Sequence, residues 1–135
     1  MLLNLLTKEE KFHFIDLLQK VFVADGQLNE FEKHILEMYK TEMGEDINKY
    51  RRSSLTFEKL VEYFANKPKT TKNIVYYNIT YVSLYDEFYS VEVHQILETI
   101  QEAFVITNKK KTELLKLLYA EKDLKEKIKR LVSEW

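Results

Sequence analysis

The sequence predicts an all-α fold: a single compact bundle of about six to seven helices, with two related helix-turn-helix halves. Three observations support this fold class. The 135 residues include only two Gly and one Pro, too few for the turns of a sheet protein. Apolar residues recur at three- and four-residue steps, which is the period of helices. A helical pattern near the N-terminus also returns 61 residues later. The length suits one domain, which we place at residues 1–135.

The repeat relates residues 21–37 to residues 82–98, and each copy reads as a helix end, a tight turn and a helix start. Two copies are too few for a solenoid, so we expect them to bury each other's apolar faces in one bundle. The predicted halves span about 8–44 and 69–106, and a C-terminal helix follows at about 108–135. The identical pairs are Val21 and Val82, Asp25 and Asp86, Ile35 and Ile96, Leu36 and Leu97, and Glu37 and Glu98.

The first helix begins at a capping box formed by Thr7 and Glu10, and it should run over residues 8–24. Apolar side chains cover most of its circumference, which is typical of a central helix. A polar strip remains on one side.

The second helix follows a turn at Gly26, which supplies the positive φ that ends a helix. Asn29 and Glu32 have the spacing of a second capping box. We therefore expect a helix over 29–43 with Gly44 as its C-cap.

The middle of the chain holds shorter elements. Residues 45–52 suit a short turn or helix. Ser54 or Thr56 then caps a short helix that ends near Asn66, because Pro68 disfavours a helical residue before it.

The second half repeats the pattern with a central helix over 69–84 and another helix from Ser90 to about residue 105. If the halves are equivalent, matching residues should be buried in both. The expected buried pairs are Leu18 and Ile79, Val21 and Val82, and Ile35 and Ile96.

The C-terminal segment is predicted to be one long helix capped by Thr107, because apolar residues keep helical spacing along it and only Glu121 interrupts them. Its distal half must cover its apolar stripe, either against its own bundle, which we favour, or against a second chain. The stripe is Leu114, Leu117, Leu124, Ile128, Leu131 and Trp135.

Composition excludes several classes of function. Without cysteine the chain has no disulfide framework, thiolate nucleophile or cysteine-based zinc site. A net charge of −1, from 21 basic and 22 acidic residues, gives no general attraction to nucleic acid. No run reaches the ~20 apolar residues of a membrane span, and the first residues lack the features of a signal peptide. We expect a cytoplasmic protein that binds no nucleic acid and has no direct membrane span.

Enzyme motifs are missing as well. The sequence has no HExxH, GxSxG or P-loop motif and no Ser/His/Asp arrangement. We therefore expect no enzymatic activity.

The segment 24–32 has the sequence ADGQLNEFE, in which Asn29 and Glu32 follow the Asp-Gly turn. This segment resembles the motif of the tellurite-resistance TerB-like family. The resemblance covers about residues 8–107, and the repeat at Asp86 strengthens it. That family is an all-helical domain with two related halves, also found near the membrane anchor of some J-domain co-chaperones. The resemblance implies a non-enzymatic module in stress response and metal-ion (tellurite) resistance.

The resemblance also implies a divalent metal ion as cofactor and a protein partner that is membrane-associated or a chaperone. Carried over by position, the metal-binding residues are Asp25 and Glu32 in the first half and Asp86 in the second. The second half departs from the motif, because Glu87 replaces the glycine and Val93 replaces the glutamate. A symmetric pair of metal sites is therefore not expected.

The acidic residues also have structural explanations. Asp25 can accept backbone N–H bonds in its turn, and Glu32 can complete the capping box. A second candidate metal cluster is Glu9, His13 and Asp16 on the polar strip of the first helix, where the alternative is a solvated strip of ion pairs.

Two functional hypotheses remain from the sequence. The first is a TerB-like module that binds a divalent cation or a protein partner through its acidic inter-helix turns. The alternative is a plain helical protein-interaction or assembly domain, monomeric or homodimeric, that needs no ion and uses the C-terminal apolar stripe.

Overall fold

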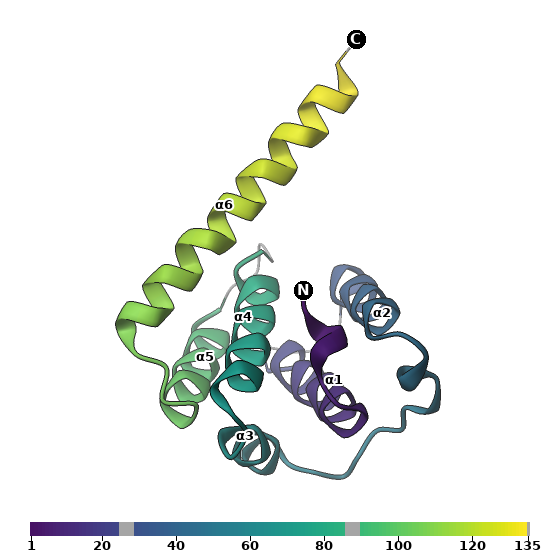
Figure 1. The fold of residues 1–135 in the computed structure, drawn as a ribbon, viewed down its shortest axis with the longest axis vertical. Coiled ribbons are helices and arrows are strands. Elements are labelled where there is room, and N and C mark those ends of the chain that lie inside the picture. The colour runs from purple at the N-terminus through teal and green to yellow at the C-terminus, as the bar shows by residue number, and fades with distance from the viewer. Residues whose placement is uncertain (25–28, 86–89, 135) are drawn as a thin grey trace. The chain divides into compact units, whose positions relative to one another are not determined.

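The computed structural model describes residues 1–24, 29–85 and 90–134, which contain helices and no β-strand (Figure 1). The predicted all-α fold with about six helices is confirmed. Two 3₁₀ helices, η1 and η2, accompany the α-helices. The bounds are η1 Leu3–Leu5, α1 Lys8–Phe22, α2 Glu30–Met43, η2 Glu45–Lys49, α3 Phe57–Ala65, α4 Lys69–Tyr85, α5 Val91–Ala103 and α6 Asn108–Ser133.

The chain divides into two compact units, Met1–Val105 and Ile106–Trp135. The first unit contains α1 to α5, and the second contains α6.

Side-chain caps fix the helix starts as predicted. Thr7 and Glu10 form the full capping box of α1: Thr7 Oγ1 accepts the Glu10 N–H at 3.2 Å, and Glu10 Oε1 accepts the Thr7 N–H at 2.8 Å. Ser90 Oγ accepts the Val93 N–H at 3.1 Å at the start of α5. Thr56 caps α3 in the same way. Each such cap stabilises its helix by about 1 kcal/mol, so local sequence alone sets these boundaries.

The two halves repeat the same pattern at the spacing of 61 residues. α1 and α4 begin at the equivalent residues Lys8 and Lys69, and α2 and α5 begin at Glu30 and Val91. Buried positions correspond as well, so the two halves use equivalent helix faces for the core. The pairs buried in both halves include Phe14 and Val75, Ile15 and Tyr76, Leu17 and Asn78, Leu18 and Ile79, Val21 and Val82, Leu36 and Leu97, Tyr39 and Ile100, and Met43 and Phe104.

α1 occupies the centre of the first unit, as its apolar circumference predicted. It contacts α2, α3, α5 and η2. Nine of its fifteen residues are buried, and they include three charged side chains, Glu10, Lys11 and Asp16. A buried charge must find hydrogen-bonding partners, so the elements around α1 have to supply them.

The end of α1 differs from the prediction. The helix stops at Phe22, two residues before Ala24. The Ala24 N–H bonds to the Val21 carbonyl at 3.2 Å, three residues back. This tighter bond closes the last turn and ends the regular helix early.

The predicted burial of Ile35 and Ile96 is wrong, because both side chains are partly exposed. Their neighbours Leu36 and Leu97 face inward instead, with 5% and 7% of their surface exposed. The buried face of α2 follows positions 32, 36, 39 and 43, and that of α5 follows the equivalent positions 93, 97, 100 and 104. Residues 35 and 96 therefore lie at the edge of each buried stripe.

Leu36→Ala and Leu97→Ala should each lower the free energy of unfolding by about 2–5 kcal/mol, since each leaves a cavity in the core. Ile35→Ala and Ile96→Ala are the matched controls and should cost less than half as much, because those side chains already contact solvent. Urea unfolding followed by circular dichroism measures all four. Equal losses at the Leu and Ile positions would contradict the assignment of inward faces.

Candidate functional site

The first predicted acidic set is only partly within the described residues. Asp25 and Asp86 lie outside them. Glu32 is buried at the start of α2, where its Oε1 accepts the Asn29 N–H at 2.9 Å, and Asn29 Oδ1 accepts the Glu32 N–H at 2.7 Å. This is the capping box that the sequence predicted, so Glu32 has a structural role whether or not it also meets a metal.

The second predicted cluster is not assembled. His13 Nε2 lies 3.8 Å from Glu9 Oε1, and the His13 ring packs against the Tyr63 ring at 4.2 Å between centroids. Asp16 bonds to a different part of the chain. Within residues 1–24, 29–85 and 90–134, no group of three or more His, Cys, Asp or Glu side chains is placed to hold a metal ion.

Asp16 anchors the connection between η2 and α3. Its carboxylate is buried and accepts hydrogen bonds from the Tyr50 hydroxyl, from the Ser53 N–H at 3.2 Å and from Ser53 Oγ at 2.6 Å. Three donors satisfy a charge that burial would otherwise penalise. Burial, followed by the hydrogen bond to Asp16, raises the pKa of the Tyr50 hydroxyl well above its usual value. Asp16 therefore holds the segment between η2 and α3 against α1 by accepting these hydrogen bonds.

Lys11 forms a second buried anchor on α1. Its Nζ donates to the Met43 carbonyl at 2.9 Å and to Asp46 Oδ2 at 3.0 Å. The Met43 carbonyl belongs to the last turn of α2, where carbonyls lack a partner within the helix. A lysine from α1 thus caps the C-terminal end of α2 and pairs with η2.

The chain matches no protein-family model, no curated protein and no solved structure. The resemblance to the TerB-like family therefore rests on the sequence motif and stays a prediction.

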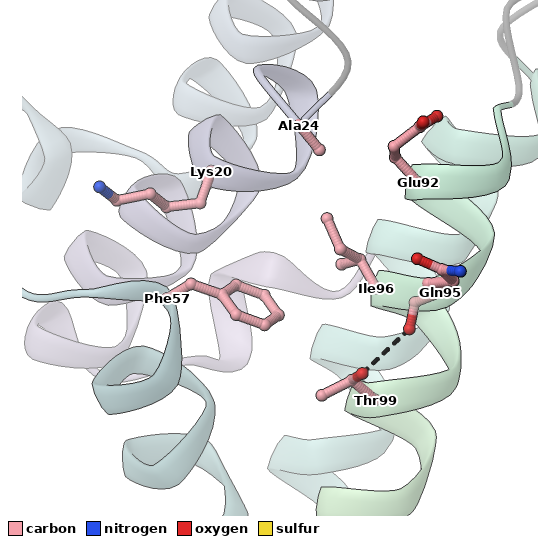
Figure 2. A pocket seen from close by; sticks show the side chains of 7 residues that line it. All are labelled: Lys20, Ala24, Phe57, Glu92, Gln95, Ile96 and Thr99. Atoms are coloured by element: carbon pink, nitrogen blue, oxygen red, sulfur yellow. Dashed lines mark hydrogen bonds between the residues drawn. The ribbon is translucent and has the colours of Figure 1, made fainter.

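An open groove of about 480 Å³ lies between α1, α3 and α5 of the first unit (Figure 2). Phe57 and Ile96 point toward each other across it. Lys20 of α1 and Glu92 of α5 also line the groove, and Figure 2 shows the Lys20 amine directed away from this apolar pair. The shape and chemistry suit an apolar side chain more than a charged ligand. The lining residues are Lys20, Ala24, Phe57, Glu92, Gln95, Ile96 and Thr99.

Sequence reasoning did not find this groove. Ile96 was predicted to face the core, and it is partly exposed because it lines the groove. Phe57 is the first residue of α3, and no helical period links it to α5.

α6 is a continuous helix of 26 residues, as predicted, and Thr107 Oγ1 caps it by accepting the Lys110 N–H at 3.1 Å. Along this helix Leu117 is 64% exposed.

A row of exposed apolar side chains runs along α6, and we call it the α6 stripe: Leu117, Leu124, Ile128 and Leu131. Their exposed fractions lie between 52% and 74%. Spacings of seven, four and three residues place all four on one face of the helix. Glu121 lies on the same face between Leu117 and Leu124, and it forms an ion pair with Lys125 at 3.2 Å. Apolar side chains in such a row are typical of a surface that binds another protein.

Tyr50→Phe should cost about 1–2 kcal/mol of stability at pH 7, because Asp16 loses one donor. The difference from wild type should shrink as the pH rises above about 10. Folding raises the pKa of Tyr50 above 10.0, so the unfolded state ionises first and wild type loses the contribution of this group.

Urea unfolding at pH 7 and at several values up to pH 11 measures this effect. Tyr119→Phe, at an exposed position on α6, controls for general alkaline destabilisation. A difference that stays constant with pH would contradict the role of the bond between Tyr50 and Asp16.

Proposed function

We propose that this chain is a non-enzymatic protein-interaction module that binds its partner through the α6 stripe. The observation that carries the proposal is the exposure of four large apolar side chains in one row of a single helix. Covering one such side chain is worth about 1.5–3 kcal/mol, so a partner surface that covers the row gains substantial free energy.

The stripe has the form of a helix-in-groove ligand. Anchors at positions 117, 124, 128 and 131 follow the spacing by which an amphipathic helix enters an apolar groove. The charged residues around the row keep α6 soluble when the row is uncovered and restrict which partner surfaces fit. The absence of enzyme motifs in the sequence supports a binding role over a catalytic one.

A second candidate is the TerB-like function, a role in stress or metal-ion (tellurite) resistance with a divalent ion bound at Asp25, Glu32 and Asp86. The matching helix starts, caps and buried positions of the two halves favour it, because the family has two related halves. The groove lined by Ala24 and Glu92 lies close in sequence to the two acidic turns. A protein partner that is membrane-associated or a chaperone belongs to this candidate.

Wild-type protein should give a saturable calorimetric or NMR response to at least one of Ca²⁺, Mg²⁺, Mn²⁺ and Zn²⁺ if the TerB-like candidate holds. Asp25→Asn or Asp86→Asn should then weaken the affinity about tenfold or more, since each removes a charged oxygen ligand. Asp123→Asn, at an exposed position of α6, is the control. A response that none of these substitutions changes would count against this site.

Capture of a partner from extract tests the interaction proposal. The tagged 135-residue chain should retain a specific partner. A variant with both Leu124→Glu and Ile128→Glu should lose it by about tenfold or more, because two anchors become charged. Tyr119→Glu, which places the same charge at an exposed residue outside the stripe, should retain it. Quantitative mass spectrometry compares the three proteins. Equal recovery with the double variant would refute a role for the stripe.

A further inference from the structure

We propose that the α6 stripe binds the α6 stripe of a second copy of this chain, with the two helices antiparallel. The inference rests on the proposed function and names the partner. It follows from the chemistry of the stripe and from the single charge that interrupts it.

The stripe has the pattern of a coiled-coil seam. In a heptad register, Leu117, Leu124 and Leu131 occupy one core position, and Ile128 occupies the other. Leucine and isoleucine at these positions are the residues by which two helices interdigitate. A two-fold pair uses the same surface on both copies, so one row of this kind is its own complement. No second kind of surface is needed to cover it.

Glu121 determines whether the two α6 helices pair in parallel or antiparallel orientation. It lies on the seam between Leu117 and Leu124, so a parallel pair in register would place the two Glu121 carboxylates against each other. Like charges brought together at a partly desolvated position repel strongly. An antiparallel pair avoids this contact, because each Glu121 then faces a leucine.

The antiparallel register also offers charge complementarity. When Leu117 packs against Ile128 of the second copy, Glu121 packs against Leu124 and lies beside Lys125 of that copy. Within one helix Glu121 already pairs with Lys125 at 3.2 Å. In the dimer, the Glu121–Lys125 pair of one copy would lie next to the same pair of the other copy at the two-fold axis. Positive and negative side chains would then alternate, and these ion pairs would link the two helices.

The size of the contact predicts a weak dimer. Residues 117–131 span about 21 Å of helix, which is a short seam with one polar layer. Interfaces at the lower end of the size range are transient, so we expect a dissociation constant on the order of tens to hundreds of micromolar. The mass in solution should therefore depend on concentration.

Analytical ultracentrifugation of the 135-residue chain from about 10 µM to about 1 mM tests the pairing. Wild type should rise toward twice the monomer mass, and so should Tyr119→Glu. The double variant Leu124→Glu with Ile128→Glu should stay monomeric and keep its circular dichroism spectrum, because the substituted side chains are exposed. A wild-type monomer over the whole range, or a dimer that the double variant retains, would overturn the proposal.

Cysteine cross-linking tests the direction, since the chain has no cysteine of its own. A mixture of Leu117→Cys and Ile128→Cys proteins should form mixed disulfide dimers under mild oxidation. Each variant alone should form at least about fivefold fewer. Efficient cross-linking of Ile128→Cys alone, without the mixed species, would show a parallel pair and overturn the antiparallel assignment.

The two experiments distinguish pairing with a second copy from binding of another protein. A protein that stays monomeric yet loses a captured partner in the double variant refutes the second copy and keeps the interaction function. A protein that neither dimerises nor shows stripe-dependent capture refutes both.

Discussion

The first unit depends on the burial of α1 on nearly every side. Apolar side chains on α1 pack toward α2, α3 and α5. Because neighbouring elements surround the helix, some of its polar side chains are buried as well. Asp16 and Lys11 are therefore buried charges that the chain must satisfy elsewhere. The segment from the end of α2 to Ser53 does so, which explains why a stretch with little regular structure follows a defined path over α1.

Much of the fold follows from local sequence, because helix starts depend on interactions over three or four residues. Thr7, Asn29, Ser90 and Thr107 all cap the helices that the sequence assigned to them. The internal repeat also predicted which helix faces are buried, because a face that is buried in one half is buried at the same positions in the other. A pattern that occurs twice constrains both copies, so the central positions of α1 and α4 could be predicted together.

The errors share a different cause, since they concern contacts between elements distant in sequence. Ile35 and Ile96 have the right spacing for burial, but the width of the buried stripe depends on what packs against it. Asp16 resembled a metal ligand because its partners Tyr50 and Ser53 lie 34 and 37 residues away. The groove at Phe57 likewise exists only once three helices are in place.

The anchors on α1 also bear on how the first unit opens. Releasing the stretch from Met43 to Ser53 while α1 stays folded would leave the Lys11 ammonium and the Asp16 carboxylate without these partners. A partial opening of that kind is costly, so this loop-rich stretch is tied to the cooperative unit of α1 in spite of its irregular backbone. Its amide protons and its peptide bonds should be protected from solvent and proteases about as well as those of a core helix.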